Sequence, residues 1–178
     1  MGFLDYVMRF RPNTQHGEIL LLGIDGSGKT SILRQLSDDD NMSVCPTQGF
    51  HIKILITGGV KLNVCDMGGQ RAARHYWRQY YGEADVAIFV VDAADPRRLL
   101  EAKEILSHCL EEEKLAGIPL LVFANKQDMI GALTPEMVSE ALNLVELRDR
   151  RWDIQGCSAK TGEGLDEGLS WIVKQLHH

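Results

Sequence analysis

Eight residues near the start of the chain limit its possible folds more than any other feature. Residues 23–30 read GIDGSGKT and match the pattern GxxxxGK[ST], directly after the apolar run at residues 19–24. A strand, a glycine-rich loop and a helix in this order place backbone N–H groups and a helix N-terminus around phosphate. Lys29 is expected to reach the β- and γ-phosphates, and Thr30 to place its hydroxyl on Mg²⁺. The alternative, an ordinary glycine-rich turn, is disfavoured by the Lys29-Thr30 pair at this position.

Apolar runs of strand length recur along the chain and predict six β-strands, at residues 19–24, 50–57, 60–66, 86–92, 120–125 and 152–157. Only Gly58-Gly59 separates the second run from the third, which predicts a hairpin. The other runs are almost continuously apolar and are separated by helix-length segments, as in parallel strands buried on both faces. Asp95-Pro96 and Thr134-Pro135 predict two helix starts. We expect an α/β fold with a mostly parallel six-stranded sheet, one antiparallel hairpin and helices on both faces.

Composition excludes several classes of protein. The 178 residues are 44% hydrophobic and 25% charged, which fits one globular domain. The net charge of −6 argues against nucleic-acid binding, which needs a basic surface. Four cysteines lie far apart without a CxxC pair, and no apolar run approaches the roughly 18 residues of a membrane-spanning helix. A cytoplasmic location is therefore expected.

A second motif predicts which base the nucleotide carries. Asn125-Lys126-Gln127-Asp128 ends the apolar run at residues 120–125. The carboxylate of Asp128 can accept hydrogen bonds from guanine N1–H and the exocyclic amine together, whereas adenine would leave it unpaired. Asn125 and Lys126 are expected to brace the loop and cover the base. After the last strand, Cys157-Ser158-Ala159-Lys160 can add a backbone N–H to guanine O6 and a lysine stem over the ring. For Asn125-Lys126-Gln127-Asp128 taken alone, a polar turn is the alternative.

A third motif follows the third apolar run and has the residue types that sense a γ-phosphate. In Asp66-Met67-Gly68-Gly69-Gln70, Asp66 is expected to hold Mg²⁺ through water, and the Gly69 N–H to meet the γ-phosphate. Gln70 is expected to orient the attacking water and is the predicted catalytic residue. Thr47 precedes the hairpin and can give Mg²⁺ a second hydroxyl, although an ordinary loop threonine is an equally good interpretation of this residue alone.

These motifs, in this order and between residues 23 and 160, resemble those of the Ras-superfamily small GTPases. Asp25, the Gly-Gly-Gln form of the third motif and residues 46–50 are similar to the Arf and Arf-like branch. Residues 46–50, 148–150 and 152–155 are most similar to its third Arf-like subfamily. The resemblance implies a P-loop G domain of six strands and five helices at residues 17–178. It also implies a GTP/GDP-dependent switch with slow hydrolysis that binds effectors in its GTP state.

The combined prediction for the site names Mg²⁺ and GTP or GDP as ligands, with Thr30 and Thr47 on the metal and Asp66 reaching it through water. Residues expected to contact the nucleotide are Asp25, Gly26, Ser27, Gly28, Lys29, Thr30, Ser31, Thr47, Gly69, Asn125, Lys126, Asp128, Ser158, Ala159 and Lys160. No arginine or lysine lies between Asp38 and Thr47 to stabilise the transition state in cis. We therefore expect unassisted hydrolysis on the order of 10⁻⁴ to 10⁻³ s⁻¹.

The first residues of the chain predict a contact with membranes. Phe3, Leu4, Val7 and Phe10 fall at helical spacing, so we expect an amphipathic helix at residues 1–16 that contacts membranes weakly and reversibly. A helix packed permanently on the domain is the alternative.

The resemblance implies three kinds of partner: an exchange factor, a GTPase-activating protein and carriers of lipid-modified cargo, often bound for a cilium or flagellum. It extends the expected location to cilium or flagellum, Golgi or other membranes, and we expect a monomer.

Two other functions compete with the switch. An ATP-dependent kinase or ATPase is opposed by residues 125–128 and by the lack of a lid or acceptor motif in the sequence. A GTP-binding scaffold with negligible hydrolysis is opposed by the presence of Thr47, Asp66 and Gln70.

Overall fold

The computed structural model describes residues 15–37 and 49–178, and these contain six β-strands. Thr47 and nearly all of the helix expected at residues 1–16 lie outside the described residues. The strands are β1 (His16–Leu22), β2 (Phe50–Thr57), β3 (Val60–Met67), β4 (Val86–Asp92), β5 (Leu120–Asn125) and β6 (Trp152–Gly156). Each strand overlaps one of the predicted apolar runs, and β1 begins three residues earlier than expected.

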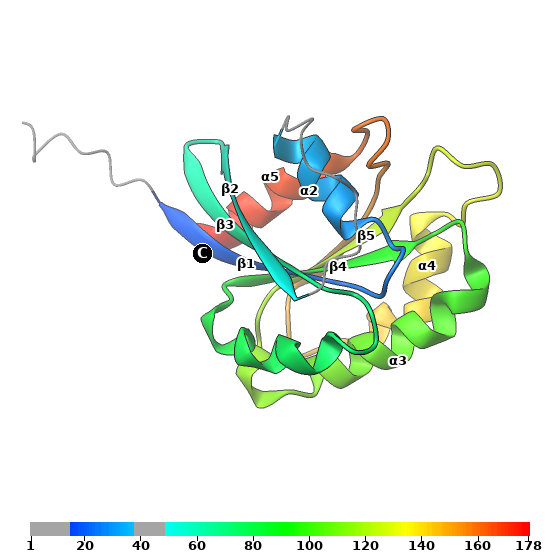
Figure 1. The fold of residues 1–178 in the computed structure, drawn as a ribbon, viewed down its shortest axis with the longest axis horizontal. Coiled ribbons are helices and arrows are strands. Elements are labelled where there is room, and N and C mark those ends of the chain that lie inside the picture. Colours follow the sequence, from blue (N-terminus) through cyan, green and yellow to red (C-terminus); the bar gives the residue numbers. More distant parts are fainter. Residues whose placement is uncertain (1–14, 38–48) are drawn as a thin grey trace, which may run out of the picture.

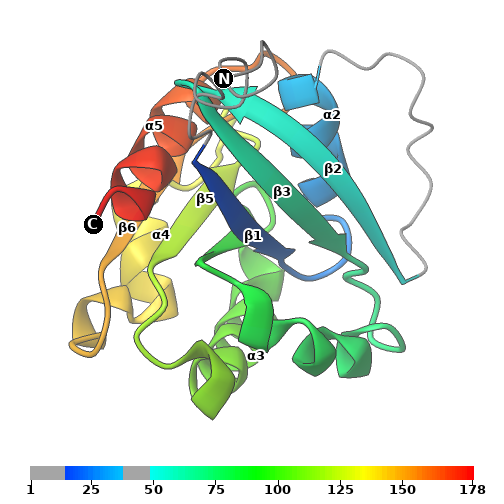
Figure 2. The same ribbon diagram turned by 90° about the vertical axis from the view of Figure 1, so that its left-hand side faces the viewer.

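The strands form one sheet in the order β2-β3-β1-β4-β5-β6. The pair β2–β3 is antiparallel, and the four other pairs are parallel. Figure 2 shows β2 at one edge of this sheet, beside β3. The predicted mostly parallel sheet with one hairpin is confirmed.

Four α-helices lie in the described part of the chain: α2 (Lys29–Ser37), α3 (Leu99–Leu110), α4 (Pro135–Leu142) and α5 (Leu165–Leu176). Figure 1 shows α2 and α5 on one face of the sheet and α3 and α4 on the other. The segment after β3 forms the 3₁₀ turns Arg74–Gln79 and Tyr81–Glu83. None of the helices in these residues is long and apolar enough to cross a bilayer.

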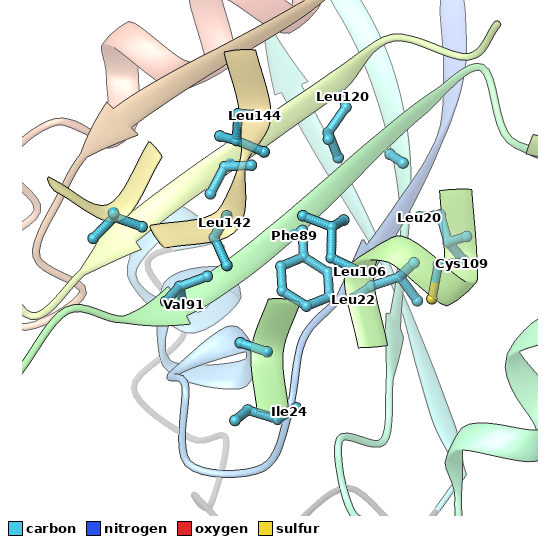
Figure 3. Packing of buried hydrophobic residues seen from close by; sticks show 14 of the residues in the cluster. Leu20, Leu22, Ile24, Phe89, Val91, Leu106, Cys109, Leu120, Leu142 and Leu144 are labelled. Carbon is cyan, nitrogen blue, oxygen red and sulfur yellow. The ribbon is translucent and has the colours of Figure 1, made fainter. Parts of the chain in front are cut away.

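The central strands are buried on both faces, which explains why they are apolar at successive positions. Alternate residues of β4 point to opposite sides, so Phe89 joins the core beneath α3 and α4, whereas Ile88 joins the core beneath α2 and α5. Figure 3 shows the first of these cores, with Leu106 of α3 and Leu142 of α4 among its members. The two cores fix the sheet and therefore the loops at its carboxyl edge.

The two predicted helix starts differ in the structure. Thr134 caps α4, because its hydroxyl accepts a hydrogen bond from the N–H of Met137 at 3.3 Å. The carboxylate of Asp95 instead accepts from Nε of Arg97 at 3.2 Å and caps nothing. A 3₁₀ turn over Pro96–Arg98 follows, and α3 begins only at Leu99.

The arrangement of the connections fixes where a ligand can bind. The strands β1 and β4 are parallel neighbours, but β1 leads to α2 on one face and β4 leads to α3 on the other. In open α/β sheets the crevice at such a divergence, outside the carboxyl ends of the strands, is the usual ligand site. The loops after β1, β3, β5 and β6 all reach this edge.

Candidate functional site

Residues 23–30, the predicted phosphate-binding loop, join β1 to α2 and enclose Lys29. Lys29 is 6% exposed, and its Nζ donates to the carbonyl oxygens of Gly23 at 3.0 Å and Ile24 at 3.3 Å. Burial lowers the pKa of Lys29 to about 8, against the opposing effect of the nearby Asp66 and Asp25 carboxylates. A buried ammonium that carbonyl oxygens hold in this way is well placed to bind an anion.

Thr30 and Asp66 meet although 36 residues separate them in the sequence. The Thr30 hydroxyl donates to Oδ2 of Asp66 at 2.7 Å, and Asp66 is fully buried at the end of β3. A hydroxyl beside a carboxylate is a hard oxygen donor set, which suits Mg²⁺. In residues 15–37 and 49–178, no cluster of three or more His, Cys, Asp or Glu residues could hold a metal. Mg²⁺ in nucleotide sites usually takes one or two protein ligands and completes its shell with water and phosphate.

Gly69 lies directly against the phosphate-binding loop. Its carbonyl accepts a hydrogen bond from the N–H of Asp25 at 3.1 Å, and a Cβ at Gly69 would lie 2.5 Å from Nζ of Lys29. Only glycine permits this approach. Trp77 secures the same segment, because its Nε1 donates to the carbonyl of Gly68 at 2.9 Å. Gln70 follows and is exposed to solvent.

Asn125 joins three loops at the other end of the site. It is 1% exposed, its Nδ2 donates to the carbonyl of Ser27 at 2.9 Å, and its Oδ1 accepts from the N–H of Ala159 at 3.0 Å. Gly28 lies so close to the Asn125 amide that a Cβ there would contact its Nδ2. The predicted base-reading segments are therefore fixed to the phosphate-binding loop.

Asp128, the predicted base reader, is oriented by another predicted residue. The hydroxyl of Ser158 donates to Oδ1 of Asp128 at 2.7 Å, which leaves the outer part of an exposed carboxylate available to a ligand. Lys126 adopts a positive φ of 68°, and its ammonium pairs with Oδ2 of Asp92 at 2.6 Å. Lys160 is exposed after β6. Among the described residues, all predicted site residues lie at this one edge, on its loops or at the adjoining ends of β3, β5 and α2.

The structure adds charged residues that the sequence analysis did not select. Arg98 pairs with Asp25 in the phosphate-binding loop at 2.9 Å, and Arg74 and Glu101 extend this contact. Asp92 is also new, as the partner of Lys126. A carboxylate in a loop that binds phosphate needs a cationic partner, because two negative groups would otherwise lie side by side. The sequence offers 19 Lys and Arg residues, however, and nothing local indicates the one that lies 73 positions away.

Comparison with known families gives a match over almost the whole chain. The model of the ADP-ribosylation factor family matches residues 3–176. ADP-ribosylation factor-like protein 3 of Chlamydomonas reinhardtii is 47% identical over 176 residues, which cover 99% of this chain and 99% of that protein. ADP-ribosylation factor-like protein 2 of Dictyostelium discoideum is 46% identical over 176 residues, which cover 99% of this chain and 96% of that protein.

A solved structure agrees with this assignment. The Arl6 BBS3 small GTPase of Trypanosoma brucei, determined with the nucleotide analogue GppNp, superimposes with a TM-score of 0.84 at 33% sequence identity. The match covers 92% of this chain and 98% of that one. The motifs, their convergence at one edge of the sheet and these likenesses agree: the chain belongs to the ADP-ribosylation factor family of small GTPases, which bind and hydrolyse GTP.

Proposed function

We propose that GTP or GDP binds across the carboxyl edge of the sheet, with its base at Asp128 and its phosphates in the loop from Asp25 to Ser31. The buried amide of Asn125 carries this proposal. It joins Ser27 of the phosphate loop to Ala159, whose neighbour Ser158 holds the Asp128 carboxylate. The predicted base reader and the phosphate loop are therefore kept at a fixed separation. In a nucleotide the sugar links the base to the phosphates, so a site that binds both must hold its two subsites at a matching separation.

Guanine selectivity follows from the state of Asp128. Its carboxylate offers two acceptor oxygens, and guanine N1–H and the exocyclic amine are two parallel donors. Ser158 holds one of these oxygens at 2.7 Å and so fixes the plane of the carboxylate. Ala159 N–H is taken by Asn125, so its predicted bond to guanine O6 requires that hydrogen bond to be shared or exchanged.

Mg²⁺ is assigned to Thr30 directly and to Asp66 through water, with Thr47 as the second hydroxyl. The metal would supply charge neutralisation at the β- and γ-phosphate oxygens. The residues Lys29 and Gly69 bind the same phosphates, and Gln70 orients the attacking water.

Gln70 is exposed beside the phosphate-binding loop, a position from which it can reach solvent water. Hydrolysis without a partner is slow, since no arginine in cis reaches the site from residues 38–47.

The GTP state is proposed to bind effectors through an apolar surface on β2 and the following turns. Phe50, Ile52, Ile54 and Ile56 alternate along β2 and are 44–78% exposed, on an edge strand. Phe50 stacks on Tyr80 with ring centroids 4.8 Å apart, beside a groove of about 660 Å³ that extends to Gln70. Cys65, the partner of Ile52 across the hairpin, stands where Arf proteins usually carry tryptophan, so this surface offers less aromatic area.

For the cellular role, we propose a monomeric cytoplasmic protein. It would help to transport lipid-modified cargo to a cilium, flagellum, Golgi or other membrane. This proposal rests on the resemblance to the third Arf-like subfamily. The N-terminal segment at residues 1–16 would add a weak, reversible membrane contact, and an exchange factor and a GTPase-activating protein would regulate the cycle. The exposed apolar face of β2 supports the effector part of this proposal.

The decisive experiment measures the affinity of nucleotide-free protein for GDP, GTP and ATP, with and without Mg²⁺. We expect tight, Mg²⁺-dependent guanine nucleotide binding and negligible competition by ATP. Asp128→Asn should then move the preference from guanine towards xanthine nucleotides, because xanthine replaces the exocyclic amine with a carbonyl that an amide can donate to. Binding of ATP comparable to that of GTP would refute the proposal and favour the ATPase.

A further inference from the structure

Four charged side chains from three separate segments form one network at the phosphate end of the site. Arg98 donates from Nη2 to Oδ1 of Asp25 at 2.9 Å, and from Nη1 to the carbonyl of Asp25 at 2.8 Å and its Oδ2 at 3.3 Å. Glu101 accepts from both Arg98 and Arg74, each at 2.9 Å. The network contains two acids and two arginines, so its formal charges cancel.

Asp25 lies beside the groups that are proposed above to bind the γ-phosphate. Its N–H contacts the carbonyl of Gly69, and Gly69 approaches the ammonium of Lys29. Lys29 and Gly69 are the two groups assigned above to the γ-phosphate. A carboxylate in this position repels a triphosphate more than a diphosphate, because GTP adds its extra negative charge at this end.

Arg98 is the main neutraliser of that carboxylate. Its guanidinium binds both oxygens of Asp25 and the backbone carbonyl in a fork, the geometry in which arginine binds carboxylate most strongly. This contact is the main reason why the pKa of Asp25 lies below its usual value. Arg74 reaches Asp25 only at 3.4 Å, because its Nε binds the carbonyl of Gly69 at 2.9 Å and its Nη2 binds Glu101.

We propose that Arg98 is a specificity-determining residue, which sets the preference of the protein between GTP and GDP by neutralising Asp25. This inference rests on the proposed nucleotide site. Arg98 comes from the turn before α3, and within residues 15–37 and 49–178 its side chain hydrogen-bonds only Asp25 and Glu101, not the base-reading loops. Its effect should therefore be larger for the triphosphate than for the diphosphate. Binding of the γ-phosphate would then depend on Arg98, a side chain that lies outside the sequence motifs.

The test compares the dissociation constants of GDP and of a non-hydrolysable GTP analogue, both with Mg²⁺, on nucleotide-free protein. Arg98→Gln should weaken binding of the analogue relative to GDP by about tenfold, as expected for one uncompensated charge near a partly solvated phosphate. The double variant Asp25→Asn with Arg98→Gln should return the ratio to within about threefold of the original, because no acid is left to neutralise. Raising the salt concentration should reduce the effect of the single variant.

Two further variants separate charge from structure. Arg97→Gln removes the neighbouring arginine, which is 89% exposed and pairs with Asp95, and should leave the ratio unchanged. Arg98→Lys keeps the positive charge but loses the two-pronged contact of the guanidinium, and it should keep most of the preference between the GTP analogue and GDP. This variant tests the proposal even if Arg98→Gln does not fold.

The outcomes distinguish the two proposals. Failure of the unaltered protein to bind either guanine nucleotide would overturn the proposed site itself. Normal binding together with an unchanged ratio in Arg98→Gln would overturn only the role of Arg98. An altered ratio that Asp25→Asn does not restore would also overturn it, since Arg98 would then act by holding α3 and not by neutralising the acid.

Discussion

The two ends of the site are built differently. At the base end, Asn125 is buried with both ends of its amide hydrogen-bonded, and Ser158 fixes Asp128. At the phosphate end, Lys29 is buried and donates hydrogen bonds to backbone carbonyl oxygens, and Gln70 is exposed. The base end is thus held together by hydrogen bonds within the protein, whereas the phosphate end holds a buried ammonium that an anionic ligand would stabilise.

This difference separates two kinds of effect. A change at the base end should alter stability and the binding of every guanine nucleotide equally. A change at the phosphate end should alter the response to pH, to the third phosphate or to hydrolysis, because those depend on charge and on exposed groups. The three predictions below test this division.

The largest effect is expected for Asn125→Asp, which keeps the shape of the side chain but places an oxygen 2.9 Å from the Ser27 carbonyl. The buried amide becomes a buried acid facing an acceptor. We expect the free energy of unfolding to fall by about 3 kcal/mol, and the affinities for GDP and GTP to fall together by about 100-fold or more. Denaturant unfolding and equilibrium nucleotide titration measure these quantities.

Asn143→Asp is the matched control, because Asn143 is exposed at the end of α4; a carboxylate at this helix C-terminus should lower stability by about 1 kcal/mol or less. A loss of affinity for GTP alone in Asn125→Asp would break the proposed division between the two ends.

The second prediction concerns the buried charge of Lys29 in nucleotide-free protein. The folded chain releases the proton of Lys29 near pH 8 and the unfolded chain near its ordinary value of 10.5, so the unfolded state binds more protons between these values. The contribution of Lys29 to the free energy of unfolding therefore rises with pH between these two pKa values. Between pH 8 and pH 10 the unaltered protein should gain about 2 kcal/mol of unfolding free energy relative to Lys29→Met.

The comparison with Lys29→Met is needed because cysteines act in the opposite direction. Burial raises the pKa values of Cys65 and Cys109 to about 11 and of Cys157 to about 12, which lowers stability above pH 9 in both proteins. Parallel pH profiles for the two proteins would show that Lys29 carries no buried charge.

The smallest effect is expected for Gln70→Leu, at an exposed position of the phosphate end. GDP affinity should not change, and stability should change by less than about 0.5 kcal/mol, while single-turnover hydrolysis of GTP should slow by about tenfold or more. Gln79→Leu alters another exposed glutamine of the same groove and should leave the rate unchanged. Equal rates in Gln70→Leu and the unaltered protein would remove Gln70 from its proposed role.

Much of the fold was predictable because its signals are local. Each predicted apolar run of six to eight residues overlaps a strand, and the Gly58-Gly59 pair joined β2 to β3 as a hairpin. Thr134 became a helix cap because the required hydrogen bond lies within three residues. Asp95 did not, because Arg97 two residues away binds its carboxylate. Even short-range rules therefore fail when a nearby side chain competes.

The sequence by itself determined the motifs from which the chemistry is predicted: residues 23–30 for phosphate, residues 125–128 for the base, and Asp66 and Gln70 for the metal and the attacking water. Only the tertiary structure decided which side chains hold these motifs together. Asn125 reaches Ser27 across 98 positions and Arg98 reaches Asp25 across 73. The physical reason is that motifs depend on neighbours in the chain, whereas these contacts depend on how the sheet and its two helical layers bring distant loops to one edge.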